Sequence, residues 1–443
     1  MTYQRVLEET GELLWSSERD GCCHLYLYDL KTASLKRQIT KGNWVVRDIL
    51  HVDQKSRRIW FAASGREAER DPYLVHVYRI DFDGNNLRLL TPEDAEHSVS
   101  FAPGGKYFAD SYSRIDSAPG AALRSSGEGS IVMTLEKPDL KVLLDSRWPW
   151  PVPFKVLAAD GKTDLYGVIF LPSTFDASKK YPVIESIYTG PQAFVTPKTF
   201  RARSAVQALA ELGFAVVALD GRGMGKRSKA FHDFSYKNLG GDTRLADHIA
   251  GIRQLTERHP YLDAQRVGVI GHSAGGYDAA NAILNHPEFY KVAVSSAGNH
   301  DHRMDKAWWN ELWMGFPAGD HYVQQSNVTL APKLQGKLLL AHGELDDNVH
   351  PASTLQLVDA LIKANKDFDL LILPGQNHGF GMSLFPPPRL GFLCTELVEC
   401  RAASTVRTTD RIALTPVSSV TSSTELTKHP AARARSPISH CSR

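Results

Sequence analysis

The sequence predicts a doubly wound, mostly parallel α/β sheet preceded by a partial all-β module, and three observations support this prediction. Residues 1 to about 145 contain short strands separated by frequent turns. After Pro182, apolar runs alternate with helical stretches, which is typical of a parallel sheet that helices cover on both faces. The motif Gly271-His272-Ser273-Ala274-Gly275 directly follows a β-branched run that begins at Val267, and small residues lead from it into a helical segment.

Composition limits the classes of function that the chain can have. With 443 residues, it is long enough for two or three domains. A net charge of +2 favours neither a nucleic-acid partner nor a strongly acidic one. No apolar run approaches the roughly 20 residues that span a membrane, and residues 1–14 show no signal peptide, so the compartment stays unknown. The five cysteines lack metal-ligand spacing, and we expect no metal and no organic cofactor.

The N-terminal module, residues 1–147, contains an internal repeat. A strand, a charged loop, a strand that begins His-Leu-Tyr or His-Val-Tyr, and a further strand after a turn occur at residues 11–40 and again at 58–91. A third set begins at His97. Repeats of roughly 50 residues made of about four strands are typical of β-propeller blades. About three blades cannot close a ring of four to eight, so either this module is not a propeller or the chain lacks upstream blades. We expect the second, a partial propeller.

The following segment, residues 148–385, carries the α/β pattern. It opens with a hairpin around Asp160-Gly161. Gly213 is expected to end the first helix. We expect strands at 183–188, 214–219, 267–270, 292–296, 337–341 and 368–373, and helices at 199–212, 242–258, 279–285 and 351–364.

Residues 386–443 form a low-complexity tail rich in Ser, Thr, Arg and Ala. It has few apolar residues to bury, so we expect it to be disordered. A doubly wound domain usually ends with one more helix under its last loop, and the sequence after His378 predicts no such helix.

Ser273 is the candidate nucleophile. In the α/β-hydrolase fold, G-x-S-x-G between a strand and a helix forms a tight turn that exposes the serine Oγ. Gly271 and Gly275 suit this turn because strand and helix approach too closely there for larger side chains. A plain glycine–serine turn is the alternative, but two segments further along the chain match the hydrolase pattern.

These two segments supply the groups that a serine nucleophile needs, a base and an acid that orients the base. His378 follows the 368–373 strand and is the expected base. Asp346 or Asp347, after the 337–341 strand, is the expected acid, and Glu344 is a weaker candidate. Both segments begin at carboxyl ends of parallel strands, where open sheets place their ligands. Spacing does not choose between the two aspartates.

Two donors are expected to stabilise the oxyanion that forms in acyl transfer. One is the backbone N–H of Ala274, directly after the nucleophile. The other comes from the loop after the 183–187 strand, either from the Tyr188 hydroxyl or from a backbone N–H. Basic residues nearby are expected to be solvated or to cap loops, with carboxylate binding as the alternative: Arg222, Lys226 and Arg227. Three tryptophans at helical spacing are expected to serve core or subunit packing rather than substrate stacking: Trp308, Trp309 and Trp313.

Together these segments resemble the prolyl oligopeptidase family, and within it the dipeptidyl peptidase IV branch. The resemblance runs from about residue 10 to Phe380. It rests on five motifs in the order of the family: Tyr188-Thr189-Gly190-Pro191, Asp220-Gly221-Arg222-Gly223, the elbow at 271–277, the loop at 342–349, and His378-Gly379.

The resemblance implies a serine peptidase that releases dipeptides from peptide N-termini. Carried over residue by residue, it implies Ser273 as nucleophile, Asp346 as acid and His378 as base. It also implies the Tyr188 hydroxyl as oxyanion donor, and a substrate site lined by two further residues, Asn348 and Val349. The implied partner is a peptide, and the chain is compatible with a homodimer.

Two departures from the branch leave the substrate open. Ala274 stands where the branch has a tyrosine that helps to wall the proline pocket, so the residue preferred next to the scissile bond is not determined. The paired glutamates that bind the substrate α-amine lie in upstream blades. The alternatives are therefore an oligopeptidase, an acylaminoacyl peptidase or an esterase on the same triad, or an inactive truncated fragment.

Overall fold

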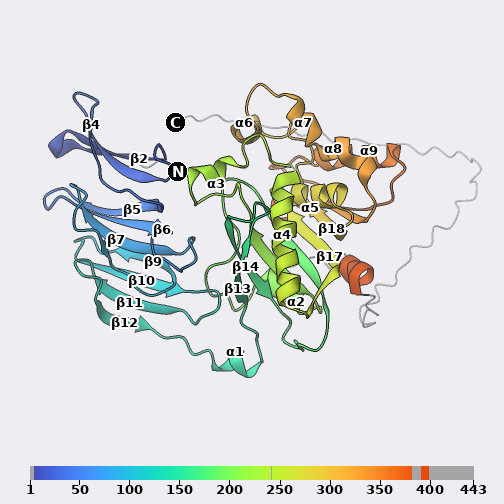
Figure 1. Cartoon of the computed structure of the whole chain (residues 1–443), viewed down its shortest axis with the longest axis horizontal. Coiled ribbons are helices and arrows are strands. Elements are labelled where there is room, and N and C mark those ends of the chain that lie inside the picture. Colours follow the sequence, from blue (N-terminus) through green and yellow to red (C-terminus); the bar gives the residue numbers. More distant parts are fainter. Residues whose placement is uncertain (1–3, 241, 382–390, 399–443) are drawn as a thin grey trace, which may run out of the picture. The chain divides into compact units, whose positions relative to one another are not determined.

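Three four-stranded antiparallel sheets follow one another along the N-terminal part of the chain (Figure 1). The structure, a computed structural model, describes residues 4–240, 242–381 and 391–398. The first sheet contains β1 (Gln4–Leu7), β2 (Glu12–Ser17), β3 (His24–Asp29) and β4 (Leu35–Gln38). The second contains β5 (Val45–Asp53), β6 (Arg58–Ser64), β7 (Val75–Asp81) and β8 (Arg88–Leu89), and the third contains β9 (Glu96–Phe101), β10 (Tyr107–Ser113), β11 (Gly120–Ser125) and β12 (Ile131–Glu136).

The internal repeat appears in the structure as repeated hydrogen bonds. In the first sheet, Thr40 Oγ1 accepts from the backbone N–H of Leu25 at 2.9 Å. In the second, Thr91 Oγ1 accepts from the N–H of Val77, also at 2.9 Å. Each threonine follows the last strand of its sheet and lies beside the strand that the His-Leu-Tyr or His-Val-Tyr signature marks. The two sheets are therefore copies of one unit, as the sequence pattern indicated.

The opening strands β1 and β5 were missed by the sequence analysis, for reasons that the structure makes clear. In β1 only Leu7 is buried, so the strand shows no alternation of apolar and polar residues. In β5 the register shifts twice, between Val46 and Asp48 and between Ile49 and His51. Such bulges place two residues opposite one and break the two-residue period on which strand prediction depends.

The α/β domain is built on one eight-stranded sheet with the order β13-β14-β16-β15-β17-β18-β19-β20. β13, β14 and β16 pair antiparallel, and the strands from β16 through β15 to β20 are parallel. The strands are β13 (Val152–Leu157), β14 (Asp164–Phe170), β15 (Tyr181–Ile187), β16 (Ala215–Asp220), β17 (Leu262–His272), β18 (Tyr290–Ser296), β19 (Lys337–Gly343) and β20 (Asp369–Leu373).

Helices cover this sheet on both faces. The long helices α4 and α5 lie over it (Figure 1), and their apolar residues share one core cluster with α9 and with strand residues such as Val183 and Val269. The next residues along the same strands, Ile184 and Ile270, face a second cluster on the other side, together with Leu209 of α2. The helices are α1 (Lys141–Asp145), α2 (Ala205–Ala210), α3 (Lys229–Asp233), α4 (Asp242–Arg258), α5 (Ala274–Asn285), α6 (Ala307–Met314), α7 (Asp320–Gln324), α8 (Asn327–Leu330) and α9 (Ala352–Lys363).

The helix expected at 199–212 is shorter than the prediction. α2 begins only at Ala205, because Ser204 caps it by accepting a hydrogen bond from the N–H of Gln207 at 3.0 Å. The preceding residues, 199–204, form no helix or strand. The backbone N–H of Phe200 donates to Ser113 Oγ, and its ring packs against Trp148. Contacts with distant residues thus outweigh the helical propensity of this stretch.

The expectation that no helix follows His378 was wrong. Residues 391–398 are helical, and they end in a π-helical turn, Cys394–Val398. Leu393 and Leu397 are 0% and 5% exposed and pack in the second core cluster beside Val292 and Val294 of β18. A short apolar segment inside a low-complexity stretch therefore completes one face of the sheet. The rest of the expected tail, residues 386–390 and 399–443, lies outside the described residues.

Candidate active site

Ser273 lies at the turn between β17 and α5, in a strained backbone conformation. Its φ of 61° and ψ of −122° are rare for a residue with a side chain and cost on the order of 1–3 kcal/mol. The turn is held by a hydrogen bond from Ser273 N–H to the carbonyl of Ser296 at 2.9 Å. A Cβ on Gly271 would lie 1.9 Å from the carbonyl oxygen of Gly275, and a Cβ on Gly275 would lie 2.3 Å from that of Ile187. Close approach therefore requires both glycines.

Three side chains from the carboxyl ends of parallel strands meet at this turn. Ser273 Oγ lies 3.0 Å from His378 Nε2, and His378 Nδ1 lies 2.7 Å from Asp346 Oδ2. Ser273 follows β17, Asp346 follows β19 and His378 follows β20. Residues that are 105 and 32 positions apart in the sequence thus form one hydrogen-bonded chain.

Asp346, rather than Asp347 or Glu344, is the carboxylate that meets His378. Asp346 is 3% exposed, whereas Asp347 is exposed. The Glu344 carboxylate accepts from the N–H of Gly375 at 3.0 Å instead. The sequence spacing could not make this distinction, because it depends on which side chain the loop turns inward.

The environment of Asp346 favours its ionised form. Burial opposes ionisation, but the hydrogen bond from His378 and those from the backbone N–H groups of Val349 and Asn348 hold the pKa of Asp346 below its usual value. These N–H groups lie 2.9 and 3.0 Å from Asp346 Oδ1. His342 Nε2 lies 3.2 Å from Oδ2. The carboxylate therefore keeps its negative charge beside the imidazole.

Tyr188 follows β15 and lines the same cavity as Ser273 and Ala274. Burial, reinforced by the Asp278 carboxylate, raises the pKa of Tyr188, so its hydroxyl keeps its proton. The hydroxyl lies 2.5 Å from Nε2 of Gln192, which donates to it. The O–H proton thus stays available for an acceptor in the cavity.

The loop that carries Tyr188 is anchored by residues that the sequence analysis did not identify. Asp278 of α5 accepts from both the N–H and the hydroxyl of Thr189, each at 2.7 Å. Arg244 of α4 donates to the carbonyl of Thr189. These contacts fix the loop to the two helices that flank the elbow strand. No sequence motif signals them, because the partners lie 89 and 55 positions apart.

His272, directly before Ser273, lies against the expected base. Its ring centroid is 4.8 Å from that of His378, and its Nδ1 lies 3.2 Å from Ser296 Oγ. The Phe380 ring packs edge-on against the His272 ring, with 5.5 Å between the ring centroids. The His378 ring therefore has a packed neighbour on the side of the elbow.

A cavity of about 380 Å³ opens at Ser273. Asn348 and Val349, which the family resemblance assigned to the substrate site, both line it. So do all three tryptophans of the 308–313 segment, which the sequence analysis expected to serve core or subunit packing rather than substrate stacking. Trp308 is 70% exposed, whereas Trp309 and Trp313 also pack against a small buried cluster of Leu239, Met314 and Tyr322. The cavity wall is thus strongly aromatic.

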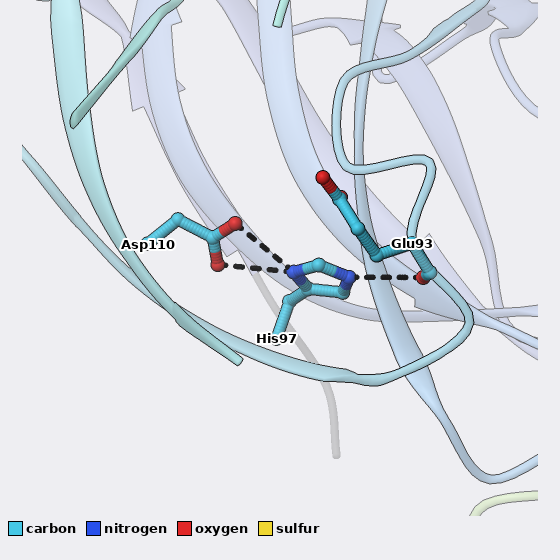
Figure 2. A group of neighbouring side chains, drawn as sticks. All are labelled: Glu93, His97 and Asp110. Atoms are coloured by element: carbon cyan, nitrogen blue, oxygen red, sulfur yellow. Dashed lines mark hydrogen bonds and ion pairs between the residues drawn. The ribbon is translucent and has the colours of Figure 1, made fainter. Parts of the chain in front are cut away.

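One group outside this cavity has the composition of a metal site. The potential ligand atoms of Glu93, His97 and Asp110 lie within 4.8 Å of one another. Figure 2 shows His97 held between the Asp110 carboxylate and the backbone carbonyl of Glu93. The guanidinium of Arg124, however, lies 2.8 Å from Asp110 and 2.7 Å from Glu93. One guanidinium already pairs with both carboxylates, so this group fits a structural ion-pair network better than a metal site.

Two protein-family models match the chain. The model of the prolyl oligopeptidase family matches residues 199–385, and that of the dipeptidyl peptidase IV N-terminal region matches residues 2–119. The first covers the elbow, the acid loop and His378. The second covers most of the three N-terminal sheets. Separately, none of the helices in the described parts of the chain has the length and apolarity that a membrane span requires.

Individual relatives and solved structures agree with these matches. Human dipeptidyl peptidase 8 is 29% identical to this chain over 84% of the chain and 45% of its own length. Mouse prolyl endopeptidase FAP is 28% identical over 82% of this chain and 48% of its own length. The crystal structure of Porphyromonas gingivalis dipeptidyl peptidase 4 superposes with a TM-score of 0.79 at 28% identity, over 89% of this chain and 56% of that one. The crystal structure of a putative dipeptidyl aminopeptidase IV from Bacteroides ovatus superposes with a TM-score of 0.75 at 27% identity, over 83% of this chain and 54% of that one. The chain spans about half the length of these relatives.

Proposed function

The chain belongs to the prolyl oligopeptidase family, and on this basis we propose that it is a serine peptidase that releases dipeptides from peptide N-termini. The observation that carries the proposal is the hydrogen-bonded chain from Ser273 Oγ through His378 to Asp346, with distances of 3.0 and 2.7 Å. The names of the relatives support dipeptide release as the outcome.

The proposed reaction is acyl transfer. His378 Nε2 takes the proton from Ser273 Oγ as that oxygen attacks the scissile carbonyl, and the ionised Asp346 stabilises the imidazolium that forms. The Tyr188 hydroxyl and the N–H of Ala274 donate to the oxyanion. His378 then gives its proton to the leaving amine. Water, activated by the same imidazole, hydrolyses the acyl-enzyme and frees Ser273.

A second candidate keeps this triad but acts on peptides without a free α-amine, as an oligopeptidase or acylaminoacyl peptidase. Asp305 is the one carboxylate among the described residues that line the cavity. It is already paired with Lys306 at 2.9 Å and accepts from Asn310 at 3.2 Å. Among the described residues, the cavity wall thus offers no unpaired carboxylate for a substrate α-amine, and this favours the second candidate.

Hydrolysis of matched substrates tests both candidates. An X-Pro or X-Ala dipeptide amide, its N-acetylated form and a simple ester are compared with the protein as it stands and with Ser273→Ala. We expect cleavage of the dipeptide amide and a loss of roughly 10⁶-fold in kcat for Ser273→Ala. Ser178→Ala, which changes an exposed serine, serves as the control.

The outcome of this comparison distinguishes the two candidate functions from each other and from an inactive chain. Preference for the N-acetylated substrate or the ester would support the second candidate. No cleavage of any substrate, with no labelling of Ser273 by a fluorophosphonate probe, would contradict both and leave an inactive chain.

A further inference from the structure

A second cavity, of about 250 Å³, adjoins the one at Ser273. The two share wall residues, Gln192 and Trp313. Gln192 is also the residue that hydrogen-bonds the Tyr188 hydroxyl. A ligand in the second cavity therefore lies next to the groups that surround the scissile bond of a bound substrate.

Positive charge dominates this second cavity. Its wall includes Arg47 from β5 and, from the loop between β16 and α3, Lys226 and Arg227. His232 lines it as well, with Nε2 at 2.8 Å from the carbonyl oxygen of Pro191. The one acidic residue in the described wall, Glu18, is exposed and forms no ion pair with any of these cations.

Arg222 belongs to the same loop as Lys226 and Arg227 but, unlike them, forms ion pairs. Its guanidinium contacts the carboxylates of Asp247 at 2.7 Å and Asp160 at 2.8 Å. It therefore caps a loop, which is one of the two roles that the sequence analysis expected for the three basic residues. Lys226 and Arg227 differ from it, since no carboxylate among the described residues pairs with either.

The cations of the second cavity are held by neutral groups instead. Arg47 donates to Ser64 Oγ at 3.1 Å and lies over the ring of Phe194. Arg227 donates to the carbonyl of Asp164 at 2.6 Å and lies over the ring of Phe231. Lys226 has neither a hydrogen bond nor an ion pair with any other residue that the structure describes.

Both the backbone conformation and the partial burial of Lys226 are unfavourable. Its φ is +72°, in the left-handed region, which is unfavourable for a residue with a side chain. Burial, together with the charge of Arg47, lowers the pKa of Lys226. The Lys226 ammonium is half-buried beside a guanidinium. The carboxylates of Asp48 and Glu18 act on it through space but form no ion pair with it, so an anion bound in the cavity would stabilise it.

We propose that Arg47, Lys226 and Arg227 form a subsite that binds a carboxylate of the peptide substrate. The inference rests on the proposed peptidase function and adds a substrate class to it, namely acidic or short peptides. The carboxylate comes either from the C-terminus of a short peptide or from an Asp or Glu side chain of a longer one. Guanidinium and ammonium groups bind both through charge-assisted hydrogen bonds.

Paired substrates separate the two sources. One pair is a short peptide with a free C-terminal carboxylate and the same peptide as its amide. The other is a longer amidated peptide with Glu, and its Gln counterpart, at each position after the cleavage site. We expect kcat/KM about tenfold or more higher for the charged member of at least one pair, and a smaller ratio at high ionic strength.

Variants assign the preference to this subsite. Lys226→Met and Arg47→Gln are each expected to bring the charged-to-neutral ratio close to one. Lys229→Met, which removes an exposed lysine three residues further on that is paired with Asp233, is expected to keep the wild-type ratio. Because two variants are used, loss of folding in one does not end the test.

Binding to Ser273→Ala, measured by calorimetry with the same peptides, keeps this inference separate from the proposed function. Tighter binding of the charged peptides, lost on Lys226→Met in that background, supports the subsite even if no peptide is cleaved. Equal binding of charged and neutral peptides would overturn it, and so would a preference that survives both Lys226→Met and Arg47→Gln.

Discussion

At the scale of single residues, the candidate site depends on which side chains are buried and which have partners. Asp346 and Asp347 are neighbours with the same chemistry, yet only Asp346 is buried against His378. Lys226 and Arg222 belong to one loop, yet only Arg222 meets carboxylates. In both cases the difference comes from residues that are distant in the sequence.

Replacing Asp346 tests its proposed role. Asp346→Asn removes the charge that orients His378 and stabilises its protonated form, and we expect kcat to fall by about 10⁴-fold. Asp347→Asn is the matched control, because this exposed neighbour has the same chemistry and does not contact His378. Steady-state kinetics on the best substrate measure both. Comparable losses in the two variants would contradict the assignment.

At the scale of elements, the N-terminal sheets are joined to each other by buried charge. Glu12 of β2 contacts Lys36 Nζ at 2.6 Å within its own sheet and Arg57 Nη1 at 2.5 Å in the turn that precedes β6. Its side chain is 3% exposed. Burial opposes ionisation, but these two partners lower the pKa of Glu12 to about 2 from the usual 4.5.

This lowered pKa predicts a pH dependence of stability. A carboxyl whose folded pKa lies below its unfolded pKa stabilises the fold above the unfolded value, and this contribution is lost as pH falls from about 4.5 to about 2. We expect Glu12→Gln to lower the free energy of unfolding at pH 7 by about 2 kcal/mol, allowing for the partial exposure of its partners. Denaturant unfolding from pH 7 down to pH 3 measures this.

The comparison with the native protein makes the test specific. The deficit of Glu12→Gln should shrink as the pH falls, because the native protein loses the same interaction. Glu9→Gln, an exposed change in the preceding turn, should show no such trend. A deficit that is constant with pH would argue for a packing defect instead.

At the scale of the whole molecule, the N-terminal module and the α/β domain contact each other through a buried ion pair. Lys198, after β15, lies 2.7 Å from Asp71, which belongs to the loop between β6 and β7. The Lys198 side chain is 5% exposed, and its ammonium lies over the ring of Tyr73. These residues are 127 positions apart.

Replacing one partner of this ion pair should destabilise the protein more than replacing both partners. Asp71→Asn leaves a buried ammonium without its counter-charge, and we expect a loss of about 3 kcal/mol in the free energy of unfolding. The double variant Asp71→Asn, Lys198→Met should recover much of this loss. Asp145→Asn breaks an exposed pair with Lys141 and should change stability by less than about 1 kcal/mol. Calorimetric melting compares the four proteins, and a double variant no better than Asp71→Asn would contradict the expectation.

Much of this architecture could be predicted from the sequence, because it depends on neighbours along the chain. The alternation of apolar runs and helical stretches predicted the parallel sheet, and the repeated His-Leu-Tyr and His-Val-Tyr strands predicted the N-terminal blades. Gly271 and Gly275 marked the elbow through a steric requirement that any strand–turn–helix of this type imposes. The order of Ser273, the aspartate pair and His378, each at the carboxyl end of a predicted parallel strand, indicated the edge of the sheet where the candidate site lies.

Only the tertiary structure decided which of these residues meet, because burial and charge pairing depend on segments far apart in the sequence. It turned Asp346 rather than Asp347 toward His378. It packed Leu393 and Leu397 onto one face of the sheet, although the composition around them predicted no helix there. It also shortened α2 through the contacts of Phe200. It also brought Arg47 beside Lys226 at a cavity wall where no carboxylate among the described residues forms an ion pair with either. Local patterns specify the elements, whereas desolvation, which a residue experiences only in the assembled fold, selects the partners.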